Sequence, residues 1–301
     1  MTVLLNCKIN QRKIKIYGVW KEIIKMFKKR LVALLCGAVV VSGLAVGCGS
    51  GDDEKGGTSK ITVSGSTSVG PTMEVLAQAY EKNNDVKIEV QQVGSSAGIK
   101  NTIEGTSDLG MSSRDLKDEE AQSVDGTQIA IDGIAVVTHK DNKVTDLTID
   151  QVKDIFTGKI TNWKEVGGED AQIVLVSREE GSGTRDGFQD ILGFESADLS
   201  KDAQICDGSG AVKSTIEGNK NAIGYISFGY VKDDIKSVKI DGVEANDDNV
   251  VNGTYAISRP FLVVNKKDNL SEEAKSFVDF ILSEEGQNIV SEEGFIKATI
   301  K

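Results

Sequence analysis

The stretch Ile173-Val174-Leu175-Val176-Ser177-Arg178-Glu179-Glu180-Gly181-Ser182-Gly183-Thr184 places an apolar run directly before a turn of glycine, serine and threonine. Apolar residues at helical spacing, Phe188, Ile191 and Leu192, follow that turn. A short apolar run bounded by glycine is typical of a buried strand, and the later stripe is typical of a helix. The sequence therefore predicts a strand, a tight turn and a helix in succession, the repeating unit of α/β folds.

Two more turns of this composition each follow a strand-like run and precede a helical pattern. They are Gly65-Ser66-Thr67-Ser68 and Gly94-Ser95-Ser96-Ala97-Gly98. A helix N-terminus leaves its first N–H groups unpaired and carries about half a positive charge. Serine and threonine add donors, and glycine allows close approach of the backbone. Three such turns predict an anion-binding site, although Ser95 and Ser96 could serve only as helix caps.

The folded part is expected from about Lys60 to Lys301, with alternating strands and helices and therefore an α/β fold. The predicted strands are 61–64, 86–93, 131–138, 173–177, 222–228 and 261–265. A helix is expected over 72–82, and another over 271–290 with Gly286 as a candidate break.

The first 47 residues indicate export. They hold nine Lys or Arg against one acid, and an uncharged run, 31–46, follows. That run is shorter than the roughly 20 residues that span a bilayer, so a secretory signal is favoured over a retained anchor. Because Met26 begins a signal of ordinary shape, residues 1–25 could come from an upstream start codon.

Leu44-Ala45-Val46-Gly47-Cys48 resembles a bacterial lipobox, which implies a palmitate-type lipid on Cys48 and an extracytoplasmic, membrane-anchored protein. Residues 48–59 then read as the lipidated cysteine and a flexible tether rich in glycine, serine and acids. Removing residues 1–47 changes the net charge from −11 to −19, so nucleic acid is a poor partner. Beyond Cys48 only Cys206 remains, which excludes an internal disulfide and a cysteine metal cluster.

Catalysis and cofactors are not indicated. The sole histidine is His139, no serine lies in a Gly-x-Ser-x-Gly elbow, and no cluster has metal-ligand spacing. We therefore expect a binding protein without a cofactor or metal rather than an enzyme.

The order of four motifs resembles the phosphate-binding subunit of the bacterial phosphate ABC importer, a periplasmic-type solute-binding protein, over residues 60–301. The motifs are Val63-Ser64-Gly65-Ser66-Thr67-Ser68, Gly94-Ser95-Ser96-Ala97-Gly98, Asp108-Leu109-Gly110-Met111-Ser112-Ser113-Arg114 and Ser177-Arg178-Glu179-Glu180-Gly181-Ser182-Gly183-Thr184. The resemblance implies two α/β lobes joined by two crossing strands, near 137–140 and 258–261. Lobe one would comprise 60–137 with 260–301, and lobe two 138–259.

The resemblance also implies inorganic phosphate as ligand and the ABC transporter permease subunits as partners. Arg178 would supply the positive charge and Glu180 would orient it. The implied ligand-binding residues are Ser66, Thr67, Ser68, Ser95, Ser113, Arg114, Arg178, Ser182, Gly183 and Thr184. Another oxyanion, such as sulfate, molybdate or tungstate, and a role as a lipid-anchored phosphate sensor remain alternatives.

Ser113 stands where some family members have an aspartate that accepts the phosphate proton. Asp115, two residues on, is the nearest carboxylate in sequence and a candidate replacement. For Arg114, contact with the anion and an ion pair with Asp115 both remain open. Trp163 is expected to pack in the core or on the surface rather than contact the ligand.

Overall fold

The structure, a computed structural model, describes residues 59–232 and 234–298. The predictions on the signal region, Cys48 and the tether therefore lie outside the described residues, apart from Ser59. Among the helices that are described, none is long and apolar enough to cross a bilayer.

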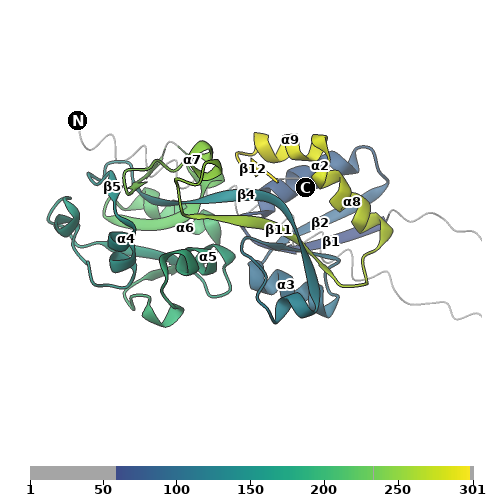
Figure 1. The fold of residues 1–301 in the computed structure, drawn as a ribbon, viewed down its shortest axis with the longest axis horizontal. Coiled ribbons are helices and arrows are strands. Elements are labelled where there is room, and N and C mark those ends of the chain that lie inside the picture. Colours follow the sequence, from purple (N-terminus) through teal and green to yellow (C-terminus); the bar gives the residue numbers. More distant parts are fainter. Residues whose placement is uncertain (1–58, 233, 299–301) are drawn as a thin grey trace, which may run out of the picture. The chain divides into compact units, whose positions relative to one another are not determined.

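The described chain forms an α/β fold, as predicted, in which helices cover a large mixed sheet (Figure 1). The strands of this sheet follow the order β2-β1-β3-β11-β4-β8-β6-β7. The strands of this path are β1 Ser59–Gly65, β2 Val86–Gln92, β3 Leu109–Ser112, β4 Val124–His139, β6 Val174–Arg178, β7 Gln204–Cys206, β8 Ala222–Ser227 and β11 Ser258–Lys266. The shorter strands are β5 Asp146–Leu147, β9 Ile235–Ser237, β10 Lys239–Ile240 and β12 Ile296–Lys297.

The α-helices are α2 Gly70–Glu81, α3 Ser95–Glu104, α4 Ile149–Phe156, α5 Gly183–Leu192, α6 Gly208–Gly218, α7 Asp247–Val251, α8 Glu272–Leu282 and α9 Glu284–Glu292. Single 3-10 turns lie at Glu120–Gln122, Trp163–Val166, Ser196–Asp198 and Phe228–Tyr230. The predicted helix over 271–290 is two helices, and the break lies at Ser283 rather than Gly286. Ser283 is extended, with φ −66° and ψ 166°, and its side chain caps α9 by accepting from Gly286 N.

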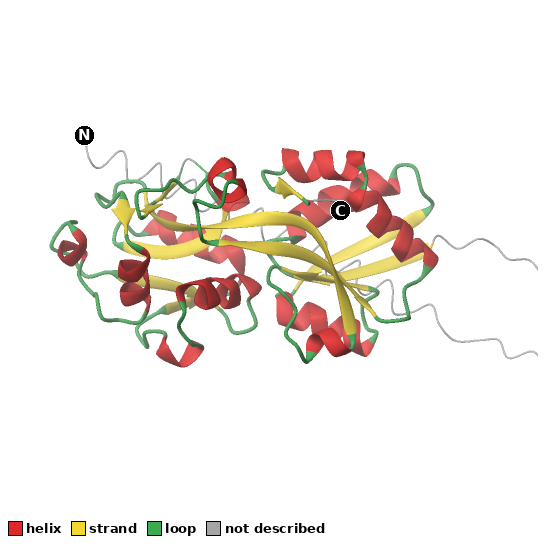
Figure 2. Cartoon of the chain, viewed as in Figure 1, coloured by secondary structure: helices red, strands yellow, loops and turns green. Residues whose placement is uncertain are grey.

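Two long antiparallel strands, β4 and β11, continue from one helix-covered group of strands to the other (Figure 2). Residues 124–133 of β4 pair with β11, and residues 134–138 pair with β8. The change of partner at Gly133 and Ile134 lies before the crossing predicted near 137–140. The return lies where β11 begins at Ser258, inside the predicted interval.

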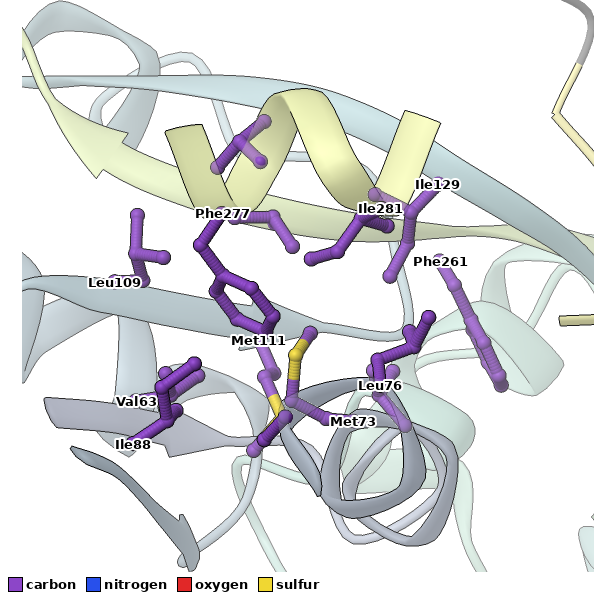
Figure 3. Packing of buried hydrophobic residues seen from close by; sticks show 14 of the residues in the cluster. Val63, Met73, Leu76, Ile88, Leu109, Met111, Ile129, Phe261, Phe277 and Ile281 are labelled. Carbon is purple, nitrogen blue, oxygen red and sulfur yellow. The ribbon is translucent and has the colours of Figure 1, made fainter. Parts of the chain in front are cut away.

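The buried apolar residues separate into groups on either side of that change. Lobe one, defined here as 59–133 with 258–298, holds the cluster drawn in Figure 3, in which Met73, Leu76, Phe277 and Ile281 pack on the sheet residues Val63 and Met111. A smaller group, centred on Ile99 and Val264, lies under α3. Burial of each large apolar side chain contributes about 1.5–3 kcal/mol. Each face of the lobe-one sheet is thus fixed by its own helices.

Lobe two is defined here as 134–232 with 234–257. Its described residues form one cluster around Phe156, Phe188 and Tyr225 and another around Val176 and Val212. Residues 134–137 belong to these clusters, although the prediction assigned them to lobe one. Trp163 lies in the first cluster with 1% of its surface exposed, and its Nε1 donates to Asn221 O. Its predicted packing role is confirmed.

Candidate anion-binding site

Four helices begin just after the carboxyl ends of parallel strands: α2 and α3 after β1 and β2 in lobe one, α5 and α6 after β6 and β7 in lobe two. Such strand ends are the usual ligand sites of open α/β sheets. Three of these turns were predicted. The fourth, Asp207-Gly208-Ser209-Gly210, was missed although it carries the same signal, a glycine and serine turn after the apolar pair Ile205-Cys206.

Hydroxyl groups from three of these turns contact one another between the lobes. Ser68 Oγ of lobe one lies 3.0 Å from Thr184 Oγ1 and 3.2 Å from Ser209 Oγ, both of lobe two. Thr67 Oγ1 lies 3.4 Å from Ser209 Oγ. Ser68, Thr184 and Ser209 are each 1% exposed. We call Thr67, Ser68, Thr184 and Ser209 the hydroxyl cluster.

The third predicted turn packs directly on the second. A side-chain Cβ at Gly183 would overlap Ser95 Oγ and would lie 2.7 Å from Ser113 Oγ. These two serines also contact each other, with Oγ atoms 3.2 Å apart, and Ser113 N donates to Ser95 Oγ at 3.1 Å. Glycine at position 183 therefore allows the start of α5 to approach two buried hydroxyl groups of lobe one.

Arg178 presents one edge of its guanidinium to the hydroxyl cluster. Nη1 donates to Thr184 Oγ1 at 3.4 Å and to Ser209 Oγ at 3.3 Å, and Nη2 donates to Thr67 Oγ1 at 3.0 Å. The adjacent edge binds Glu179, with Nε 2.7 Å from Oε2 and Nη2 2.6 Å from Oε1. The resemblance implied that Glu180 orients Arg178, but the carboxylate that does so is Glu179.

The charge of Glu179 is stabilised in place. Burial alone would raise the pKa of this carboxyl, but hydrogen bonds from Arg178 and the charge of that residue outweigh burial and hold the pKa below its ordinary value. Gly208 N donates a further hydrogen bond to Oε2 at 3.1 Å. Glu179 therefore remains ionised at neutral pH and keeps the guanidinium oriented.

Tyr225 supports Arg178 from the core of lobe two, a role that the sequence did not reveal. Its hydroxyl accepts from Arg178 N at 3.2 Å and lies 2.8 Å from Ser177 Oγ. Burial raises the pKa of the phenol, which keeps it neutral. Arg185 Nη1 donates to Arg178 O at 3.2 Å. The backbone of Arg178 is thereby fixed on both sides.

Two predicted ligand residues use their hydroxyl oxygens inside their own turns. Ser66 Oγ accepts from Ser68 N at 3.2 Å and from Val69 N at 3.3 Å. Ser182 Oγ caps α5 by accepting from Arg185 N at 3.3 Å. These serines shape the turns that present the neighbouring donors, and their direct contact with a ligand stays a prediction.

Arg114 is bound by protein groups on every side. Nε donates to Asp186 Oδ2 at 2.9 Å, and Nη1 and Nη2 each donate at 2.8 Å to one oxygen of Glu120. The remaining N–H groups bond to Asp115 O and Ser96 Oγ. All five donors have partners, and three of them bond to carboxylates, so turning this guanidinium to an anion would leave a carboxylate without its hydrogen bonds. Arg114 forms ion pairs with Glu120 and Asp186 instead of the pair with Asp115 that the sequence left open. The pair with Asp186 connects the two lobes.

Asp115 is exposed, in contrast to the buried Ser113. A carboxylate that accepts the phosphate proton must lie at the buried ligand, so exposure removes Asp115 as the candidate replacement. Within the described residues no group of three or more His, Cys, Asp or Glu is arranged to hold a metal ion. Hydroxyl, guanidinium and helix N–H donors together suit a small oxyanion.

Comparison with known proteins agrees with this chemistry. Residues 51–285 match the model of the PBP superfamily domain. The chain is 35% identical to the phosphate-binding protein PstS of Bacillus subtilis over 295 residues, covering 91% of this chain and 96% of the relative. It is 29% identical to PstS of Borreliella burgdorferi, with 89% and 98% covered.

A solved structure described as a phosphate ABC transporter substrate-binding protein with bound phosphate, from Clostridium perfringens, is 60% identical. The match has a TM-score of 0.78 and covers 80% of this chain and all of the other. An ABC-type phosphate transport receptor from Vibrio cholerae matches at 38% identity with a TM-score of 0.69, covering 79% and 100%. This chain therefore belongs to the PBP superfamily and, within it, to the family of PstS phosphate-binding proteins.

Proposed function

We propose that this protein binds inorganic phosphate outside the cytoplasm and delivers it to the permease subunits of an ABC importer. The observation that carries the proposal is the hydroxyl cluster with Arg178 at its edge, built from turns of both lobes. The phosphate-bound relative at 60% identity supports the same ligand. A protein that only carries phosphate needs donors and no nucleophile, so no catalytic step is part of the proposal.

Binding of the anion exchanges contacts within the site. Ser68 Oγ and Thr184 Oγ1 are only 3.0 Å apart, so a phosphate between them requires both hydroxyl groups to turn from each other to the phosphate oxygens. Since Ser68 belongs to lobe one and Thr184 to lobe two, the bound anion would connect the lobes. Such a ligand favours the closed arrangement because it makes its full set of contacts only there.

Calorimetric titration of stripped protein tests the proposal. We expect saturable binding of one phosphate per chain, with sulfate inert at equal concentration, and native mass spectrometry of the purified protein should show phosphate carried through purification. Tighter binding of sulfate than of phosphate would contradict the assignment.

A second candidate ligand is another oxyanion. Three carboxylates near the site already accept hydrogen bonds from arginine: Glu179 from Arg178, and Glu120 and Asp186 from Arg114. A proton on phosphate would then be accepted by a hydroxyl such as that of Ser113. Because a hydroxyl can rotate to donate, it rejects an unprotonated oxyanion less strongly than a carboxylate does. Competition of phosphate binding by sulfate, molybdate or tungstate would favour this alternative.

Membrane attachment through Cys48 is part of the proposal. A lipid on the cysteine after the apolar run would hold the protein beside the permease. We expect Cys48→Ser to release the protein from the cell envelope into the medium, measured by immunoblot of cell and medium fractions. Retention of the variant in the membrane fraction would favour an uncleaved anchor.

A further inference from the structure

A second buried arginine reaches the hydroxyl cluster from the strands that join the lobes. Arg259 Nη2 lies 3.3 Å from Ser68 Oγ, and its Nη1 donates to Ser113 O at 3.1 Å. Only 2% of its side chain is exposed. The motifs that predicted the site do not include Arg259, which follows Ser258 at the start of β11.

Asp132 holds this guanidinium in one orientation. The two residues are Cα partners on β4 and β11, and Oδ2 accepts from Nε at 3.2 Å and from Nη2 at 2.9 Å. The other oxygen, Oδ1, accepts from Ser227 Oγ at 2.8 Å and from Phe228 N at 3.2 Å. Asp132 thus has hydrogen bonds on both oxygens and serves to anchor the arginine.

Arg259 retains donor capacity, unlike Arg114. A guanidinium has five N–H groups, and the described residues supply partners for four of those of Arg259: two at Asp132, one at Ser113 O and one at Ser68 Oγ. The Ser68 contact, at 3.3 Å, is long for a charge-assisted bond. One hydrogen on Nη1 has no partner, and the Nη2 hydrogen that donates to Ser68 Oγ makes only a long bond. Both can therefore donate to an anion.

Both arginines donate to the hydroxyl cluster, each to different members of it. Arg178 donates to Thr184 and Ser209, and Arg259 donates to Ser68, which contacts both of these residues. Each guanidinium also has its own carboxylate partner, Glu179 for Arg178 and Asp132 for Arg259, and in each case Nη2 donates both to that carboxylate and to a hydroxyl of the cluster. An anion among the hydroxyls would meet donor edges from two directions.

Building on the proposed phosphate function, we propose that Arg259 is a second guanidinium of the ligand site, donating to the bound oxyanion and favouring its doubly charged form. Two guanidinium groups favour the dianion over the monoanion more strongly than one guanidinium does, because the second negative charge of the anion is attracted by both. Arg259 also extends from the joining strands, so the anion would be in contact with both lobes and with the connection between them.

The experiment compares phosphate affinity for the full protein and for Arg259→Gln, at pH values well above and well below the second pKa of phosphate. Arg259→Gln should lower affinity for the dianion about tenfold or more and affinity for the monoanion less. The titratable groups whose charges act on Arg259 are Asp132 on β4, which also accepts its hydrogen bonds, Arg178 on β6 and Tyr225 on β8. The ratio of variant to wild-type affinity at each pH separates the loss of Arg259 from the titration of the ligand.

Two further variants separate binding from folding. Tyr255→Phe, close to the same strands, removes a buried hydrogen bond to Ile134 O and should lower the thermal midpoint without changing affinity. If Arg259→Gln does not fold, the double variant Asp132→Asn with Arg259→Gln removes the charge and leaves no unpaired buried carboxylate.

Each outcome decides the proposal. If the wild-type protein does not bind phosphate, the proposed function fails before any variant is compared. Suppose that the wild type binds phosphate and that Arg259→Gln, or the double variant if only that one folds, binds both forms with unchanged affinity or loses affinity equally for both. Arg259 is then only a structural connection, and the inference is overturned. A selective loss of the dianion supports it.

Discussion

Arg178 and Arg114 are both buried arginines of this protein that contact residues of both lobes, yet their surroundings are opposite. Arg114 meets two carboxylates, Glu120 and Asp186, and all its donors have partners. Arg178 meets one carboxylate, and its other edge rests on hydroxyl groups at 3.0–3.4 Å. Burial and charge are therefore shared by the two arginines, whereas the kind of acceptor distinguishes them: carboxylates take three donors of Arg114, and hydroxyl groups take three donors of Arg178.

This difference separates two tasks. A guanidinium satisfied by carboxylates stabilises the contact between lobes, since replacing its partners by an anion would leave those carboxylates unpaired. A guanidinium resting on hydroxyl groups can exchange them for phosphate oxygens at little cost, because a hydroxyl can rotate to donate to the same anion. Arg114 thus connects the lobes, and Arg178 is suited to the ligand.

The largest effect is expected from Arg178→Ala. The change removes charge-assisted donors and leaves Glu179 without its partner, so phosphate affinity should fall by about 3 kcal/mol or more, roughly a hundredfold. Calorimetry measures the affinity, and circular dichroism checks that the fold is kept. Unchanged affinity in a folded variant would show that the ligand does not meet this edge of Arg178.

Gly183→Ala should come next. The added methyl group would overlap Ser95 Oγ and would hold the start of α5 away from lobe one. Overpacking of this kind costs about 1–3 kcal/mol, so we expect phosphate affinity to fall about tenfold. Gly210→Ala is the matched control, because a Cβ at that position in α6 meets nothing within 4 Å. Equal affinities of the two variants would refute the close approach of the lobes at Gly183.

Asp186→Asn tests the opposite member of the comparison. It removes the interlobe charge pair of Arg114 and leaves the pair with Glu120 in place. Since Asp186 retains 22% side-chain exposure, the pair should contribute only about 0.5 kcal/mol, and phosphate affinity should weaken about twofold. A loss as large as that of Arg178→Ala would mean that Arg114 and Arg178 do not differ in task.

The smallest effect concerns stability in acid. Burial would raise the pKa of Glu120, but hydrogen bonds from Arg114 and Lys117 and the Arg114 charge hold it below the ordinary value of 4.5. A lowered carboxyl pKa adds stability above pH 4.5 that is lost as pH falls through the folded-state pKa. Thermal midpoints should therefore fall less steeply in acid for Glu120→Gln than for the wild type. Parallel curves would exclude Glu120 as a source of acid sensitivity.

Much of the fold could be predicted from local patterns. Short apolar runs, with alternation in 86–93, predicted the strands, and the glycine and serine turns predicted where α3 and α5 begin. Both signals are properties of neighbouring residues. The break between α8 and α9 was placed three residues late. Glycine suggested it, but the capping side chain of Ser283 sets it.

Partners distant in sequence could not be predicted in the same way. Arg259 and Asp132 lie 127 residues apart and meet only because β11 pairs with β4. The pairing of Arg114 with Asp186 likewise depends on the contact between lobes. Asp115 was the nearest carboxylate in sequence to Ser113, yet it is exposed, since distance along the chain does not give distance in space.

The sequence by itself determined the α/β class, three of the four turns at the site and Arg178 as the arginine beside them. These features are local, so residues within one strand–turn–helix unit contain them. Only the tertiary structure decided which arginine donates to exchangeable hydroxyl groups, which carboxylate orients it, and that Ser209 and Arg259 lie at these hydroxyl groups. Hydrogen-bond satisfaction is the reason, because the acceptors of a buried guanidinium depend on every group packed around it.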